Sequence, residues 1–280
     1  GDSVMGNASS AGPLAFGALD GAGPLSLFIG GRVMPGRYPE PATSLLLRNE
    51  GGRFLVAQRF DRLGLVSGAV FTDLDADGRP ELALACEWGP IRLFRQQGGQ
   101  FVAWDPPVTV RPGPGADALT GATQLHELTG WWTGIAAGDL DGDGRLDLIA
   151  ANWGLNHHAR RASVAHPRRL YYGDLDGSGT VDLIEAYFDA AMGKEVPDRG
   201  YQAVVAAMPF VQEKAPTYEA YGTASVQELY GERLQNAGRV EVAALASMVF
   251  FNRGDHFEAV PLPAEAQWAP AFGVCVGDAD

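Results

Sequence analysis

The chain has 280 residues, of which 46% are hydrophobic, so it can bury a substantial core and wholesale disorder is excluded. Its formal net charge of −13 disfavours a nucleic-acid partner, because phosphate contacts need a concentrated basic face. No apolar run reaches the roughly 18 residues of a membrane-spanning helix, so we expect no membrane span, and no N-terminal signal-peptide pattern is present.

The 37 glycines and 18 prolines predict short elements separated by turns. Strand-like runs occur at 25–29, 44–47 and 53–56, and the last two are separated by Gly51-Gly52. The same pattern returns at 81–104, where three apolar runs are separated by Gly89-Pro90 and by Gly98-Gly99. Short strands with glycine turns are typical of all-β folds.

Three nine-residue segments share one acidic pattern: DLDADGRPE at 73–81, DLDGDGRLD at 139–147 and DLDGSGTVD at 174–182. Each has oxygen-bearing side chains at positions 1, 3, 5 and 9, with glycine at position 6, where the chain must turn sharply. Clustered carboxylates repel one another unless a cation lies among them, and an all-oxygen ligand set suits Ca²⁺. The repetition predicts two to three calcium ions as the only cofactor.

We expect side-chain oxygens at positions 1, 3, 5 and 9 and the main-chain carbonyl at position 7 to bind each ion. In the first loop these are Asp73, Asp75, Asp77 and Glu81 with the Arg79 carbonyl. In the second they are Asp139, Asp141, Asp143 and Asp147 with the Arg145 carbonyl. In the third they are Asp174, Asp176, Ser178 and Asp182 with the Thr180 carbonyl. Because Ser178 replaces a carboxylate, the third site should bind most weakly.

An EF-hand is the alternative interpretation of these loops, but it takes its bidentate carboxylate from position 12 and has flanking helices. Position 12 is Leu84 in the first loop, Ala150 in the second and Glu185 in the third, so only the third would fit. Flanking runs such as 146–150 and 168–172 are short and rich in strand formers. They favour a strand–loop–strand arrangement closed at position 9.

Traces of the same pattern occur near both ends of the sequence. Residues 18–26, ALDGAGPLS, keep the register but retain only Asp20 among the acids, so we expect a turn without a metal. The apolar run 272–276 is followed by Gly277 and then by residues 278–280, which look like the first positions of a further loop. We therefore expect the chain to be a fragment.

Residues from about 200 to 246 are richer in helix formers and predict a small helical insertion between strands. We expect Asp198 to cap a helix over 201–208, with Pro209 ending it. The tyrosines of this segment, Tyr218, Tyr221 and Tyr230, could face a ligand, but packing of the helices onto the sheet is the preferred interpretation.

The repeated strands and loops predict an all-β fold, a β-propeller with an incomplete set of blades, covering residues 1–280 in about four to five repeats. The segments that carry this pattern resemble the FG-GAP/VCBS repeats of integrin-α-like propellers, and more narrowly bacterial propellers related to cartilage acidic protein and associated with ASPIC/UnbV domains. The segments are LFIGGRVMPGRYPEP at 27–41, FTDLDADGRPELALACEWGPIRLF at 71–94, GDLDGDGRLDLIAANWGLN at 138–156 and APTYEAY at 215–221. No ASPIC/UnbV segment is recognisable.

This resemblance implies a secreted or cell-surface, calcium-stabilised propeller that acts as a non-catalytic scaffold for a protein or a glycan. The alternative is a carbohydrate-active propeller enzyme with its site at the channel mouth. No nucleophile elbow, HExxH zinc motif or phosphate loop supports an enzyme. The residues to inspect for catalysis are the acids Glu87, Glu185, Glu195 and Asp189, and His157-His158 with Trp153 and Asn156 form the one polar-aromatic cluster outside the loops that could do chemistry. Glu87 with Trp88, and Trp131-Trp132, could line a sugar-binding surface, but packing between blades is the preferred interpretation of these aromatics.

Two further groups have several interpretations. Cys86 and Cys275 lie in apolar runs, where buried free thiols are preferred over a disulfide. Arginines and histidines between 157 and 169 form the one basic cluster, which could meet an anionic ligand but which we interpret as a solvated loop.

Overall fold

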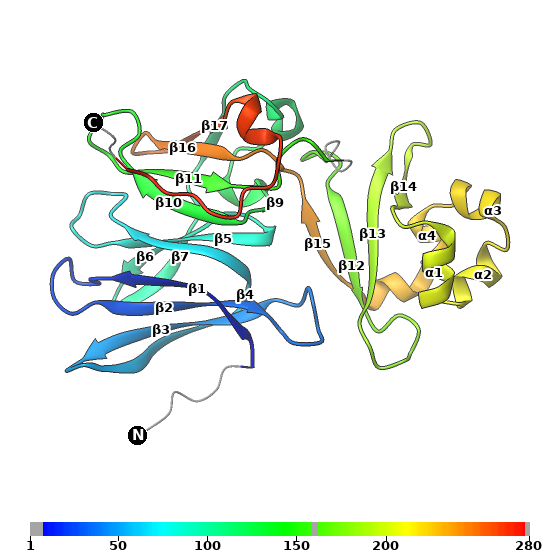
Figure 1. The fold of residues 1–280 in the computed structure, drawn as a ribbon, viewed down its shortest axis with the longest axis horizontal. Helices are drawn as coiled ribbons and strands as arrows, with labels where there is room; N and C mark the ends of the chain where they lie inside the picture. Colours follow the sequence, from blue (N-terminus) through cyan, green and yellow to red (C-terminus); the bar gives the residue numbers. More distant parts are fainter. Residues whose placement is uncertain (1–7, 158–161, 278–280) are drawn as a thin grey trace.

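The computed structural model describes residues 8–157 and 162–277, which form a mostly β structure (Figure 1). The predicted further loop at 278–280 and residues His158, Arg160 and Arg161 of the basic cluster lie outside these described residues. Within the described part of the chain, no helix is long and apolar enough to cross a membrane.

The largest sheet is built from consecutive strands of the N-terminal half. They are β1 (Ser10–Gly17), β2 (Ser26–Val33), β3 (Ala42–Glu50), β4 (Arg53–Thr72), β5 (Glu81–Gly89), β6 (Arg92–Gln97) and β7 (Gln100–Trp104), with β9 (Gly130–Trp131) beside β5. All neighbouring strands are antiparallel. The long strand β4 pairs first with β3 and then with β5, and Gly64, whose φ is +135°, lies between the two halves. A glycine there allows the bend between them.

The second sheet combines distant parts of the chain. Its order is β10 (Gly134–Gly138), β11 (Asp147–Ala151), β16 (Met248–Asn252), β17 (Phe257–Pro261) and β8 (Val108–Val110). Strand β11 pairs directly with β16, and β8 adds to β17 in parallel. Everything between β11 and β16 is therefore an insertion into this sheet.

The insertion contains the third sheet and the helices. The sheet order is β14 (Lys194–Pro197), β13 (Asp182–Asp189), β12 (Arg168–Gly173) and β15 (Gly238–Val242). Between β14 and β15 lie α1 (Tyr201–Ala207), α2 (Phe210–Lys214), α3 (Tyr218–Thr223) and α4 (Val226–Tyr230). Figure 1 shows these helices on the side of the third sheet that faces away from the other two sheets. Short 3₁₀ helices cover Ala116–Leu119, Leu125–Glu127, Gly231–Asn236 and Ala264–Gln267.

The first two sheets pack face to face around Trp132, which is fully buried with Phe250 and Met248 of β16 and Leu93 of β6. Its indole Nε1 donates to the Leu128 carbonyl at 3.0 Å, so the buried polar atom is satisfied. A separate cluster that contains Trp88, Leu170 and Val242 packs the inserted sheet against the others. Trp132 is thus a packing residue, and the packing interpretation is confirmed for it.

The helices pack on the inserted sheet through a further cluster, in which Tyr221 and Tyr230 are buried. The packing interpretation is confirmed for these two, whereas Tyr218 is 62% exposed. The predicted cap at Asp198 is wrong. Gly200 precedes α1 and no side chain caps it, because the Asp198 carboxylate accepts a hydrogen bond from Arg168 Nη2 instead.

The two cysteines are both free, with Cys86 buried and Cys275 exposed. The prediction of a buried thiol is therefore confirmed for Cys86 and wrong for Cys275. The reason is that the apolar run 272–276 forms no strand, although it passes close to Gly134 and Gly138 of β10. The basic-loop interpretation is also wrong for Arg168, which is 3% exposed in β12.

Candidate functional site

Each acidic loop connects two antiparallel strands, and all three hairpins have the same register. The residue before each loop pairs with the acid at position 9: Thr72 with Glu81, Gly138 with Asp147, and Gly173 with Asp182. The acid at position 9 is therefore the first residue of the next strand. The strand–loop–strand prediction is confirmed. The EF-hand alternative is wrong even for the third loop, because its flanks are the strands β12 and β13.

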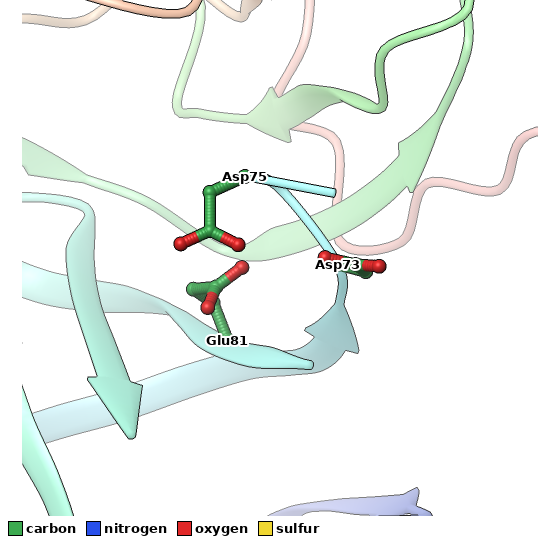
Figure 2. Close-up of side chains that lie close together, drawn as sticks. All are labelled: Asp73, Asp75 and Glu81. Atoms are coloured by element: carbon green, nitrogen blue, oxygen red, sulfur yellow. The ribbon is translucent and has the colours of Figure 1, made fainter. Parts of the chain in front are cut away.

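The carboxylates at positions 1, 3 and 9 converge in every loop. Within each loop, one oxygen from each of these three acids lies within 4.8 Å of the other two. The groups are Asp73–Asp75–Glu81, Asp139–Asp141–Asp147 and Asp174–Asp176–Asp182. Figure 2 shows the first group, with the carboxylates of Asp75 and Glu81 facing one another and Asp73 beside them. Three like charges this close repel one another, so each group could hold a cation.

The acid at position 9 anchors each loop to its hairpin. One of its oxygens accepts a hydrogen bond from the backbone N–H at position 2, and the bonded pairs are Glu81–Leu74 at 2.7 Å, Asp147–Leu140 at 2.8 Å and Asp182–Leu175 at 3.0 Å. Glu81 is 2% exposed, and burial raises its pKa to about 7 despite that hydrogen bond. Burial also raises the pKa values of Asp147 and Asp182, and neighbouring aspartates add to the effect.

The acid at position 1 and the glycine at position 6 form the turn. The carboxylate accepts the N–H of the glycine in the pairs Asp73–Gly78, Asp139–Gly144 and Asp174–Gly179, each at 3.0 Å. These glycines have φ values between 83° and 86°, in the left-handed region that side chains rarely adopt. The left-handed backbone at position 6 thus confirms the predicted requirement for glycine there.

The side chains at position 5 do not join the carboxylate groups. Asp77 and Asp143 accept the N–H of position 7, from Arg79 at 2.8 Å and from Arg145 at 2.9 Å. In the third loop, Ser178 Oγ accepts the Thr180 N–H at 3.3 Å. Binding of a cation by these side chains, and by the carbonyls of position 7, remains a prediction.

Two residues that contact the loops were not predicted from the sequence: Asn252, the last residue of β16, and Arg253, which follows it. The Arg253 guanidinium donates to Asp141 Oδ2 at 2.6 Å and lies 3.4 Å from Asp143 Oδ2, and the hydrogen bond lowers the pKa of Asp141. The amide of Asn252 is buried and donates to the carbonyls of Leu74 and Leu146, which ties the first and second loops together. Nothing in the local pattern around residue 252 pointed to these loops, which lie more than a hundred residues earlier.

The buried acid of the first loop makes the stability of the metal-free protein depend on pH. Its pKa rises from 4.5 to about 7 on folding, so the folded protein binds more protons than the unfolded chain in this window. As pH rises through the window, the free energy of unfolding should fall relative to that of Glu81→Gln, by on the order of 3 kcal/mol. Urea unfolding of both proteins in chelator measures it. Asp20→Asn, which changes an exposed acid in the turn at 18–26, is the control. A difference between the wild type and Glu81→Gln that does not change with pH would refute the raised pKa of Glu81.

A second feature is a cavity of about 530 Å³ where the three sheets meet. Its walls include Trp88 of β5, Trp131 of β9, Trp153 after β11 and Phe272 of the C-terminal segment. Its polar lining residues include Arg32, Tyr38, Glu87, His157, Arg168 and Glu185. The structure thus brings together Glu87, Trp88 and Trp131, predicted for sugar contact, with Trp153 and His157 of the polar-aromatic cluster, whereas Trp132, next to Trp131, belongs to the core.

The four acids inspected for catalysis are held in other interactions. Glu87 pairs with Arg32, Glu185 lies 3.2 Å from both Arg168 and Arg199, and Glu195 lies 3.2 Å from Arg169. Asp189 accepts the backbone N–H groups of its own turn, from Ala191 at 2.9 Å and Met192 at 3.0 Å. Only Glu87 and Glu185 of the four line the cavity. Three of the four acids are thus paired with arginines, and the fourth binds its own turn.

Comparison with curated proteins gave no match to this chain. Comparison with protein families gave one match, to the family described as FG-GAP-like repeat, over residues 73–150. This segment begins at the first residue of the first loop and includes the whole second loop, together with the strands from β5 to most of β11. Residues 73–150 are therefore similar to an FG-GAP-like repeat.

Proposed function

We propose that the chain is a calcium-binding, propeller-type module of FG-GAP repeats that acts outside the cytoplasm as a non-catalytic scaffold for a protein or glycan ligand. The observation that carries the proposal is the threefold convergence of carboxylates at positions 1, 3 and 9 in hairpins of identical register. A single acidic turn would be an ordinary solvated turn. Three turns with one geometry, in a chain that carries an FG-GAP-like repeat, favour the same kind of ligand, a cation, in each loop.

Calcium is the cation that suits these loops best. The converging ligands are all oxygen atoms, and the described residues of the loops offer no histidine or cysteine, which zinc or copper would prefer. Positions 5 and 7 could complete the six to eight oxygens that Ca²⁺ takes. When bound, the ion would neutralise the repulsion among the carboxylates and hold the hairpin turn in place.

Two antiparallel runs of strands, β1 to the first half of β4 and the second half of β4 to β7, support a propeller-type arrangement. The interaction role is favoured over catalysis because Glu87, Glu185 and Glu195 are paired with arginines and Asp189 binds its own turn. The hydrolase alternative would need a carboxylate freed from such a pair.

Native mass spectrometry of the intact protein tests the proposal by counting bound ions. With calcium, two or three ions should remain bound, and Asp141→Ala should lose one of them because its loop keeps only two converging acids. Asp20→Asn is the matched control and should keep the full count. A protein without bound calcium at millimolar calcium would refute the proposal.

Removing Arg253 should strengthen calcium binding to the second loop. The guanidinium occupies Asp141 Oδ2 and so competes with a cation for that carboxylate. We expect Arg253→Gln to raise the calcium affinity of this loop about fivefold, as suits a partly exposed ion pair of about 1 kcal/mol. Calorimetric titration measures it, with Asp141→Ala identifying the second-loop signal and Arg37→Gln, which removes an exposed pair with Glu40, as the control. A weaker affinity would mean that Arg253 instead holds the loop in its binding shape.

A further inference from the structure

We propose that the cavity where the three sheets meet binds the ring of a neutral sugar, so that the ligand of this module is a glycan. The inference rests on the proposed scaffold function and names its ligand class. The cavity volume, about 530 Å³, lies within the range of small-molecule sites. Its lining contains both aromatic rings and arginine–glutamate pairs.

The aromatic lining forms a connected series of rings. Trp88 and Trp131 are 5.1 Å apart at 86°, Trp131 and Trp153 are 5.5 Å apart at 70°, and Trp153 and Phe272 are 6.1 Å apart at 84°. These edge-to-face contacts hold the rings in place, and His157 adds two more, with its ring centroid 5.9 Å from that of Trp131 and 6.1 Å from that of Trp153. The apolar C–H face of a pyranose ring is a suitable partner for an indole face, because both are flat and apolar.

The polar lining is an ordered hydrogen-bond network. Trp88 Nε1 donates to the Tyr38 hydroxyl at 2.7 Å, and that hydroxyl donates to Glu87 Oε1 at 2.6 Å. The other Glu87 oxygen accepts from Arg32. Glu87 is therefore held in place from two sides, with its half-buried carboxylate beside a guanidinium. This arrangement presents fixed acceptors and donors side by side, which is what neighbouring sugar hydroxyls require.

The charge of the cavity favours a neutral ligand over a cation or an anion. Glu87 is paired with Arg32, and Glu185 lies 3.2 Å from Arg168. A quaternary ammonium in an aromatic cage would be favoured by a carboxylate without a guanidinium partner. An anionic ligand would be favoured by arginines without carboxylate partners. With each lining carboxylate matched by an arginine, hydroxyl groups are the chemistry that fits.

The cavity also explains what the insertion contributes. Arg168 and Glu185 come from β12 and β13 of the inserted sheet, Glu87 and Trp88 from β5, and Trp153 from the chain leaving β11. No single sheet supplies the whole lining. A bound sugar would therefore contact the first sheet, the inserted sheet and the chain that leaves β11.

The test begins with the intact, calcium-loaded protein on a printed glycan array, followed by calorimetric titration of the best neutral oligosaccharide. Trp153→Ala should weaken binding at least about tenfold, whereas Trp268→Ala, a 64% exposed tryptophan outside the cavity, should bind as the wild type does. Glu87→Gln should weaken neutral-sugar binding and shift preference toward uronate-containing glycans, since Arg32 then lacks its carboxylate. A merely structural role for Glu87 would not produce that shift.

Calcium-dependent stabilisation is measured on every variant, so that failure of the two proposals can be told apart. A protein stabilised by calcium that binds no neutral glycan, or only charged glycans, or choline alone, would overturn the sugar site and leave the calcium module intact. Neutral-glycan binding that Trp153→Ala does not weaken would also overturn it. Neutral-glycan binding by a protein that calcium does not stabilise would support the cavity and refute the calcium proposal.

Discussion

Saturating calcium is expected to raise the free energy of unfolding by about 2.7 kcal/mol for each occupied loop when free calcium is about a hundred times its dissociation constant. The reason is that the converging acids at positions 1, 3 and 9 repel one another without a cation, and only the folded hairpin gathers them. Binding energy at each loop is therefore folding energy. Urea unfolding followed by tryptophan fluorescence, in calcium and in chelator, measures the difference.

Single substitutions should divide this stabilisation among the loops. Asp141→Ala should remove more of it than Ser178→Ala, because it deletes one of the converging carboxylates whereas Ser178 carries no charge. Asp20→Asn should leave the calcium effect unchanged. Unfolding curves that coincide in calcium and chelator would contradict a structural role for the ion.

Asp147→Ala is expected to lower the free energy of unfolding by about 2 to 6 kcal/mol even without calcium, because one buried and one half-buried N–H group then lose their acceptor, at about 1 to 3 kcal/mol each. Asp147 is fully buried, and its two oxygens accept the N–H of Leu140 and the N–H of Asn252, both at 2.8 Å. It therefore joins β11 to β16, the pair that brackets the insertion.

Asp143→Ala is the matched control in the same loop. Its carboxylate is partly exposed and pairs with Arg145 and Arg253, so in chelator the variant should lose no more than about 1 kcal/mol. Chemical unfolding in chelator compares the two variants directly. Equal losses of unfolding free energy in the two variants would contradict a larger stabilising contribution from the hydrogen bonds of Asp147.

The loops were predictable because their chemistry is local. Nine consecutive residues contain the acids, the glycine and the start of the next strand, so spacing alone determines which side chains can converge. Three repeats of that spacing, with strand-forming flanks, predicted the hairpins that the structure contains. Position 5 is the exception, since Asp77 and Asp143 bind the N–H of position 7 in place of joining the group.

The cavity was not predictable, because it depends on pairings between distant strands. Trp88, Trp131 and Trp153 were each noticed, but nothing local distinguishes Trp131, which lines the cavity, from its neighbour Trp132, which fills the core. Alternation along a strand sends the two side chains to opposite faces. Which face is buried depends on β10, β11 and β16, and the last of these returns only after the insertion.

Arg253 and Cys275 also show that local sequence does not determine which distant segments pair. Arg253 reaches Asp141 because β16 lies beside β11, a contact that spans 112 residues of sequence. Cys275 lies in an apolar run that looked like a buried strand, yet the run forms no ladder and the thiol is exposed. Apolar composition alone does not decide whether a run joins a sheet, since this one passes the edge strand β10 without pairing with it.

A crystal structure of the protein grown with calcium, with anomalous data collected to locate the ion, tests the central claim most directly. The account predicts an anomalous peak among the carboxylates of positions 1, 3 and 9 in the first two loops, with Asp77 and Asp143 turned toward it, and a weaker peak in the third loop. Loops that hold only water at millimolar calcium, with the side chains of position 5 still bound to position 7, would contradict it.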